Sequence, residues 1–242
     1  MKENNWFDPF YIQSHLNEEE SNIQKNVRDF CNNELKPTVV ERNRKNEFDQ
    51  SLYPKFGSLG VLGQTVKTHG GSGTSNLAYG LVAYEFEKID SSYRSSISVQ
   101  SSLVIHPINE FGSQEQKDKY LSPLIKGEKI GCFGLTESEA GSDPASMKTS
   151  FKKIKDGYIL NGSKNWITNA PIADIFIIWA IEEGKDHKNI KGFILEKNNE
   201  GLNTSTIENK TSLKISPTGQ IILDNVFVPN NLCLENLSLI HI

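Results

Sequence analysis

The amino-acid sequence predicts an α+β multidomain protein, with an N-terminal all-α helical domain followed by an antiparallel β-barrel or β-sandwich domain. The first observation is a change of period, because apolar residues recur about every 3.6 positions up to Gly127 and about every 2 positions beyond it. The second is a series of short apolar runs after Gly127, separated by turn residues and without helical intervals. We therefore expect a helical domain at 1–127, a β domain at 128–235 and an irregular tail at 236–242.

Composition indicates a folded protein and excludes several classes of partner. Hydrophobic residues make up 36% of the chain and charged residues 23%, a balance that argues against a disordered protein. The formal net charge is -4 without a block of Lys or Arg, so neither nucleic acid nor a membrane is predicted as a partner. No apolar run reaches the roughly 18 residues of a membrane-spanning helix, and the first residues match neither a signal peptide nor a transit peptide.

The cysteines and histidines predict neither a disulfide framework nor a metal site. Cys31, Cys132 and Cys233 are far apart and form no CxxC pair, and the five histidines show no HxxxH or HExxH spacing. Reduced thiols, together with a composition rich in Asn, Lys and Ile, predict a cytoplasmic and bacterial protein.

The first helix is predicted to begin after Asn17, because an N-cap side chain is followed three residues later by Glu20. Pro37 is expected to kink or end this helix. Its apolar face consists of Ile23, Val27, Phe30 and Cys31.

Three more helices are expected after a glycine-rich loop at 69–73. The last of them has a capping box formed by Ser113 and Gln116, and it should end before Gly127. The middle one carries few charges and is expected to be buried. The three are placed at 77–89, at 92–111 and from Ser113 onward.

Turn signals and apolar runs define the strands of the second domain. Hairpin turns are predicted at Asp156-Gly157 and at Asn161-Gly162, on either side of a very short strand. Because the strands are short and no GxGxxG occurs, a Rossmann domain is excluded. The other strands are expected at 132–135, 175–181, 192–195 and 220–228, the last interrupted by Asp224-Asn225.

Residues 131–149 have the features of an anion-binding loop that follows a strand. Gly141 frees the backbone to adopt positive φ or to approach a ligand, and the Ser142 hydroxyl beside exposed N–H groups suits a pyrophosphate. An ordinary loop that turns at Asp143-Pro144 explains the same residues. Both interpretations stay open, and Glu137 and Glu139 are assigned no catalytic role.

Trp166 and Thr168 lie in one predicted strand and offer an indole face and a hydroxyl to a flat heteroaromatic ring. Taken alone, Trp166 is more typical of a core residue, so this interpretation depends on the combination. Trp179, in an apolar strand, is expected in the core.

Arg94 is a cation among small and apolar residues without an obvious local carboxylate. Burial of an unpaired guanidinium is costly, and a carboxylate bound through two hydrogen bonds would relieve that cost. A ligand could supply this carboxylate. A surface position, or an ion pair with Glu87 or Asp90, is the alternative.

Several linked motifs resemble the acyl-CoA dehydrogenase family over nearly the whole chain, up to about Pro229. They are CFGLTE, GSDPASM, NGSKNWITN and AYEFEKIDSSYRSSISVQSSLVIHP, and the last is similar to the glutaryl-CoA dehydrogenase branch of the family. The resemblance implies FAD as the cofactor, held in three places. Phe133, Leu135 and Thr136 would lie along the isoalloxazine ring, Gly141 and Ser142 at the pyrophosphate, and Trp166, Ile167 and Thr168 near N5.

The same resemblance implies a substrate and partners. Arg94, Ser98 and Glu87 would surround the γ-carboxylate of glutaryl-CoA, with Ser142 as a further substrate contact. The implied reaction is oxidative dehydrogenation and decarboxylation to crotonyl-CoA, with electrons passed to an electron-transfer flavoprotein by a homotetrameric full-length enzyme. Another short-chain acyl-CoA as substrate, or a noncatalytic flavin- or acyl-CoA-binding module, is the alternative.

The family's catalytic glutamate lies in a C-terminal helical bundle, within a Tyr-Glu-Gly motif that this sequence does not contain. No catalytic residue is therefore assigned, and the chain is expected to be an N-terminal fragment that is inactive alone. The residues after Pro229 resemble a truncated or frameshifted end.

Overall fold

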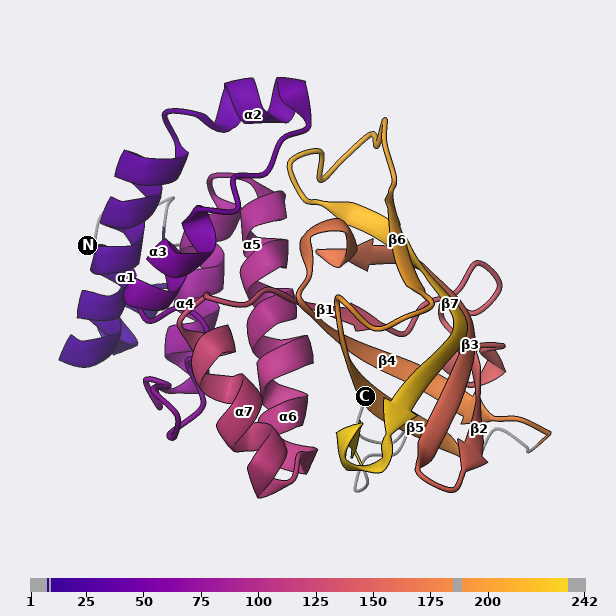
Figure 1. The fold of residues 1–242 in the computed structure, drawn as a ribbon. Coiled ribbons are helices and arrows are strands. Elements are labelled where there is room, and N and C mark those ends of the chain that lie inside the picture. Colours follow the sequence, from indigo (N-terminus) through magenta and orange to yellow (C-terminus); the bar gives the residue numbers. More distant parts are fainter. Residues whose placement is uncertain (1–7, 9, 185–188, 235–242) are drawn as a thin grey trace.

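The computed structural model describes residues 8, 10–184 and 189–234. Helices form one half of the molecule and strands form the other (Figure 1). The irregular tail expected at 236–242 lies outside the described residues. The predicted order, a helical domain and then a β-sheet domain, is confirmed.

Capping and turn residues set the helix boundaries largely as expected. Both predicted capping boxes are present, at Asn17 before α1 and at Ser113 before α7. The α1 segment continues through a π-helical turn and ends at Leu35, two residues before Pro37. The helices are α1 Glu18–Phe30, α2 Val39–Lys45, α3 Leu52–Ser58, α4 Asn76–Glu87, α5 Ser91–Ser98, α6 His106–Phe111 and α7 Gln114–Ile125.

Between α5 and α6, the π-helical segment η3 Val99–Ile105 keeps the chain helical from Ser91 to Phe111. This matches the expected helix at 92–111, and half of its residues, among them Ile97 and Val104, are buried. Short 3₁₀ turns complete the helical inventory at Ile12–His15, Pro144–Ser146, Ala170–Ile172 and Asn230–Leu232.

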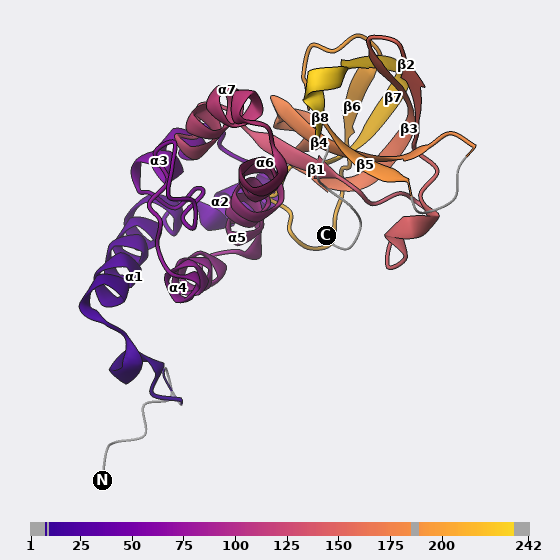
Figure 2. The same cartoon turned by 90° about the horizontal axis from the view of Figure 1, so that it is seen from below.

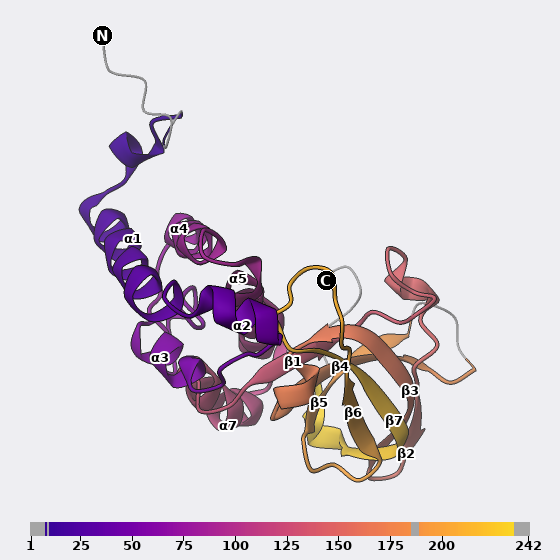
Figure 3. The same ribbon diagram turned by 90° about the horizontal axis from the view of Figure 1, so that it is seen from above.

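The strands form one curved sheet in the order β6-β7-β3-β2-β4-β5-β8, with β1 paired to β4. Viewed from below and from above, this sheet curls on itself beside the helices (Figures 2 and 3). The strands are β1 Gly131–Gly134, β2 Ser150–Ile154, β3 Gly157–Thr168, β4 Ile175–Glu182, β5 Ile190–Glu196, β6 Leu202–Thr206, β7 Thr218–Pro229 and β8 Cys233–Leu234.

The sheet is mixed rather than purely antiparallel, which corrects one detail of the expected β domain. β4 runs parallel to β1 and to β2, whereas the other pairings are antiparallel. Parallel neighbours need a long crossover connection. Here β3 and the segment after it provide the crossover from β2 to β4.

The turn at Asp156-Gly157 joins β2 to β3 as predicted, but the predicted hairpin at Asn161-Gly162 is wrong. β3 continues through these residues, which form a bulge where the pairing with β7 shifts register between Leu160 and Gly162. Gly162 has a φ of 141°, and a Cβ atom there would lie 2.6 Å from the Cα of Thr149. The Asn-Gly pair therefore bends a strand instead of ending it.

β4 separates two hydrophobic clusters, because alternate residues point to opposite faces of the sheet. Ile175, Ile177 and Trp179 belong to the cluster that includes the helices, which confirms Trp179 as a core residue. Phe176, Ile178 and Ala180 belong to a second cluster inside the curved sheet.

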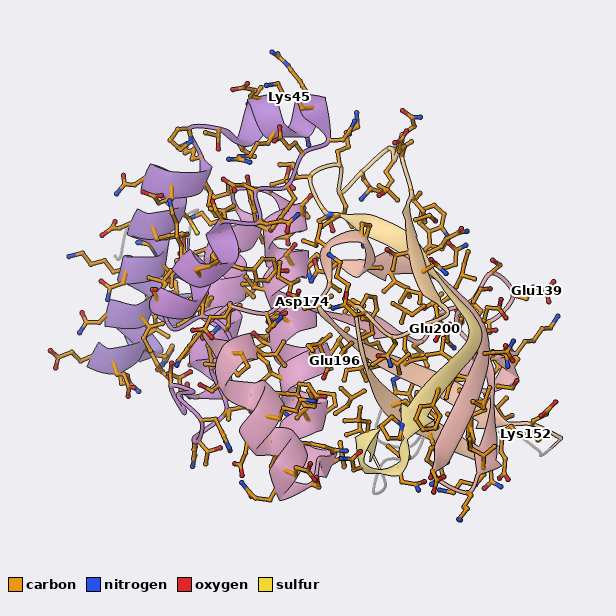
Figure 4. All side chains as sticks on the ribbon, viewed as in Figure 1. Lys45, Glu139, Lys152, Asp174, Glu196 and Glu200 are labelled. Atoms are coloured by element: carbon orange, nitrogen blue, oxygen red, sulfur yellow. The ribbon has the colours of Figure 1, made fainter. Side chains whose placement is uncertain are left out.

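Buried polar contacts join the two halves. The side-chain amide of Gln100 on η3 donates to the carbonyls of Leu124 and Lys129, both at 2.9 Å, and its oxygen accepts the Gly131 N–H at 2.8 Å. Asp174 and Glu196 lie at this junction (Figure 4). Glu196 accepts hydrogen bonds from Tyr120 and Lys119 of α7, each at 2.8 Å. Of the helices that the structure describes, none is long and apolar enough to cross a membrane.

Candidate functional site

The two segments predicted to contact a flat cofactor lie next to each other at the C-terminal ends of β1 and β3. The chain leaves β1 at Gly134 and runs beside β3, where the Asn165 N–H donates to the Thr136 carbonyl at 2.9 Å. The Asn165 side-chain amide also donates to the Ser138 hydroxyl at 3.3 Å. Thr136 and the segment 165–168 are thus brought together, although they are about thirty residues apart in sequence.

A second bulge in β3 turns the Trp166 side chain outward. The pairing with β7 shifts register between Lys164 and Ile167, and Trp166 has a φ of 61°, which is unusual for a bulky residue. The Asn165 side-chain oxygen stabilises this conformation by accepting the Trp166 N–H at 3.0 Å. Trp166 is 58% exposed, so the core interpretation of this residue is wrong, whereas Ile167 is buried.

Trp166 and Thr168 line a cavity of about 410 Å³. Its other walls are Thr218 on β7 and the loop 207–213, which the sequence interpretation did not single out. Thr136, Gly141 and Ser142 do not line this cavity. Local sequence patterns carried no signal for the loop, because it precedes β7 and reaches this cavity when β7 pairs with β3.

Lys164 is a further residue that the sequence interpretation missed. Its side chain is fully buried, and the ammonium lies 2.8 Å from Glu137 Oε1 and 3.0 Å from the Leu135 carbonyl. Burial lowers the pKa of Lys164 to about 8, against the opposing effect of Glu137. Burial alone would raise the pKa of Glu137, but hydrogen bonds from Lys164, Thr149 and Lys148 outweigh it, and that pKa is lowered.

The predicted anion-binding residues lie on the exposed loop between β1 and β2. Gly141 and Ser142 are both exposed, and a Cβ atom on Gly141 would meet nothing within 4 Å. Gly141 does not adopt positive φ, so of its two expected uses only close approach to a ligand remains a prediction. A pair of backbone hydrogen bonds between Glu137 and Ala140 shapes the start of the loop.

Phe133 and Leu135 pack toward the helices. Both are partly buried against the cluster that includes the helical core, and the Phe133 ring lies 6.0 Å from that of Trp179, centroid to centroid. Their contact with a flavin ring stays a prediction.

The expectation that Arg94 lacks a local carboxylate is wrong. Its Nε donates to Glu87 Oε2 at 2.8 Å, and the two side chains are 36% and 46% exposed. The Ser91 hydroxyl also donates to Glu87, and the hydrogen bonds from Ser91 and then Arg94 lower the pKa of Glu87. Ser98 lies one helical turn beyond Arg94 on α5 and is partly exposed. The three residues therefore lie on neighbouring helices.

Family models match both halves of the chain. Residues 17–128 match the acyl-CoA dehydrogenase N-terminal domain, and residues 132–226 match the acyl-CoA dehydrogenase middle domain. A short-chain specific acyl-CoA dehydrogenase of Clostridium acetobutylicum is 37% identical over 216 residues, which cover 88% of this chain and 57% of the relative. The chain thus spans less than two thirds of that relative.

Solved structures agree with this result. A glutaryl-CoA dehydrogenase from Mycobacterium smegmatis in complex with FADH2 is similar with a TM-score of 0.89 at 39% identity, over 93% of this chain and 57% of that one. A glutaryl-CoA dehydrogenase in complex with glutaryl-CoA has a TM-score of 0.85 at 32% identity, over 90% of this chain and 56% of that one. The chain belongs to the acyl-CoA dehydrogenase family.

Proposed function

We propose that this chain carries two binding sites of an FAD-dependent dehydrogenase that converts glutaryl-CoA to crotonyl-CoA and carbon dioxide. One is the flavin edge, formed by Thr136, Trp166 and Thr168. The other is the acyl-end site, formed by Glu87, Arg94 and Ser98, which would bind the far end of the acyl chain. The observation that carries the proposal is the Arg94–Glu87 ion pair beside Ser98. FAD, when bound, accepts the hydride from the β-carbon of the acyl chain. No catalytic base is proposed among the residues of this chain.

Arg94 retains the donors that a dicarboxylic thioester needs. A guanidinium has five N–H donors, and of these, only Nε donates to Glu87. Within residues 8, 10–184 and 189–234, no hydrogen bond engages the two terminal nitrogens of Arg94. They remain available for a second carboxylate in a two-bond arrangement, and the Ser98 hydroxyl is one turn away.

The flavin edge fits a planar ring by its chemistry. Trp166 presents an exposed indole, Thr168 adds a hydroxyl, and both border the same cavity. A backbone bulge places Trp166 there against its normal φ preference, and such bulges are frequent near active sites. The similarity to a structure that contains FADH2 supports FAD as the cofactor.

A neutral short-chain acyl-CoA is the second candidate substrate. Glu87 already neutralises Arg94, so the pair does not require a charged ligand. The similarity to a short-chain specific relative supports this candidate equally well.

Binding of glutaryl-CoA and of butyryl-CoA to the purified chain in the presence of FAD separates the two candidates. If Arg94 meets the γ-carboxylate, Arg94→Gln should weaken glutaryl-CoA binding about tenfold or more, or ~1.4 kcal/mol, and leave butyryl-CoA binding unchanged. Arg44→Gln on α2, an exposed arginine elsewhere in the helical half, is the charge-matched control. An equal loss for both thioesters would contradict the glutaryl-CoA proposal.

An electron-transfer flavoprotein as acceptor and a homotetrameric full-length enzyme are parts of the same proposal, supported by membership of the family. The resemblance to the family assigns the catalytic base to a C-terminal helical domain. We expect no turnover of glutaryl-CoA by this chain with an electron-transfer flavoprotein. Sustained turnover would show that the base lies among these residues.

A further inference from the structure

Lys164 is a buried cation between the two segments proposed to contact the flavin, 134–137 and 165–168. Its side chain is 0% exposed, and its stem packs against Gly134 of β1, where a Cβ atom would lie 3.3 Å from Lys164 Cγ. The ammonium reaches Glu137 Oε1 at 2.8 Å, the Leu135 carbonyl at 3.0 Å and Met147 Sδ at 3.8 Å. The cation therefore has one charged partner and two neutral ones.

These contacts surround the residues proposed to touch the cofactor. Leu135 and Glu137 are the neighbours of Thr136 in sequence, and Lys164 lies two residues before Trp166. One ammonium thus connects the Leu135 carbonyl and the Glu137 carboxylate, on either side of Thr136, to the strand that carries the Trp166 bulge.

Glu137 extends the connection to the far end of the loop. Its Oε1 accepts the Thr149 N–H at 2.9 Å, and its Oε2 accepts the Lys148 N–H at 2.7 Å. The exposed loop that carries Gly141 and Ser142 therefore begins and ends on one carboxylate. Two backbone donors and one ammonium satisfy this carboxylate.

A buried ion pair of this kind adds little stability compared with apolar residues of similar size, because both charges must be desolvated. Its removal as a pair is therefore expected to leave global stability nearly unchanged. The local geometry, in contrast, is expected to change. Neutral side chains at 137 and 164 would give the Leu135 carbonyl and the Thr149 N–H weaker hydrogen-bond partners or none.

We propose that Lys164 is a positioning residue which, through Glu137, holds Thr136 and the Trp166 bulge in the arrangement that binds the flavin. This inference rests on the proposed FAD site. It goes beyond that site because it assigns the cofactor geometry to a residue that does not touch the cofactor. A purely structural role would stabilise the β half without moving Trp166.

The test compares Lys164→Met and the neutral pair Lys164→Met/Glu137→Gln with the wild type. Lys148→Met is the control, because Lys148 is exposed and pairs with the exposed Glu139. Urea unfolding measures stability, hydrogen exchange of the Asn165 amide measures local order, and the NMR signal of the Trp166 indole N–H reports its environment. Quenching of flavin fluorescence measures FAD affinity.

We expect the neutral pair to unfold near the wild-type urea midpoint and to lose at least about tenfold in Asn165 protection and in FAD affinity. The Trp166 indole signal should shift, and the Ile178 amide in β4 should keep its protection. Lys148→Met should match the wild type in every measurement.

Unchanged Asn165 protection and an unchanged Trp166 signal in the neutral pair would overturn the positioning role. If the wild-type chain fails to bind FAD, the proposed function loses its support, but the two NMR measurements still decide the role of Lys164. If Lys164→Met does not fold, the neutral pair alone decides the question.

Discussion

Two ion pairs in this chain have the same N···O separation of 2.8 Å but opposite surroundings. Arg94 and Glu87 join α4 and α5 at the surface, where both side chains are more than one third exposed. Lys164 and Glu137 join β3 to the segment after β1, with 0% and 10% of their side chains exposed. The N···O distance therefore does not distinguish the roles of the two ion pairs, whereas the burial of their side chains does.

The difference follows from solvation. Water screens the Arg94–Glu87 pair, so each partner can exchange the other for a ligand at low cost. The Lys164–Glu137 pair lies in a medium of low polarity, so neither partner can leave without an uncompensated charge. The exposed pair is thus suited to bind a ligand, and the buried pair is suited to hold the backbone.

The largest expected effect comes from removing one partner of the buried pair. Glu137→Leu leaves the Lys164 ammonium buried with neutral partners only, and it should lower the free energy of unfolding by about 3–5 kcal/mol. Urea unfolding followed by circular dichroism measures the change. Glu139→Leu is the control, because Glu139 lies two residues away at the outer edge of the β half (Figure 4) and its pair with Lys148 is exposed. A loss of equal size in both variants would refute the contrast.

The second prediction concerns pH. Burial lowers the pKa of Lys164 from 10.5 to about 8. Between pH 8 and pH 10.5, Lys164 is therefore protonated in the unfolded chain and neutral in the folded chain. Stability should therefore rise with pH across this window, by up to about 3 kcal/mol, and be independent of this group below it. Urea unfolding across the window measures the rise, which Lys164→Met should not show. If Lys164→Met shows the same rise of stability with pH, the rise must come from other titratable groups.

A third prediction compares two glycines, one at each end of the segment 131–141. A Cβ atom on Gly131 would lie 2.5 Å from Val104 Cγ1, where β1 meets η3. Gly131→Ala should therefore cost about 1–3 kcal/mol through overpacking. Gly141→Ala, with nothing within 4 Å of the new atom, should change stability by less than about 0.5 kcal/mol. Thermal unfolding of both variants gives the comparison, and a reversed order would contradict it.

Of the two ion pairs, the exposed pair should show the smaller effect. Arg94→Gln should lower the free energy of unfolding by less than about 1 kcal/mol, because surface ion pairs contribute little. Added salt should narrow the difference between variant and wild type further. Urea unfolding at low and high salt measures both quantities, and a large, salt-independent loss would mean that Arg94 supports the fold.

Predictability from sequence differed between the two halves for physical reasons. Helix ends depend on residues within one turn, so Asn17 with Glu20 and Ser113 with Gln116 could be identified as capping boxes. Hairpin signals are local too, yet Asn161-Gly162 misled, because the same residues suit a bulge when the strand pairs with β7. The strands β6 and β8 and the helices α2 and α3 are not predicted from the sequence, since they are short and carry weak periodicity.

The candidate site divides in the same way. Trp166, Thr168 and Thr136 were found by motif, and the Asn165 N–H to Thr136 carbonyl bond places their segments side by side. Lys164 was overlooked although it lies within the same motif, because nothing local distinguishes a buried lysine from an exposed one. The sequence offers both Glu87 and Asp90 as partners of Arg94, and the packing of α4 against α5 selects Glu87.

The sequence by itself determined the order of the domains and the capped helix ends, since each depends on neighbours in the chain, and its motifs supplied the residues proposed to bind the cofactor and the carboxylate. Tertiary structure alone decided that Trp166 faces outward, that Arg94 is already paired, and that Lys164 is enclosed with Glu137. Burial and strand register arise only when distant segments pack together, and these two quantities set the charge and the direction of each side chain in the site.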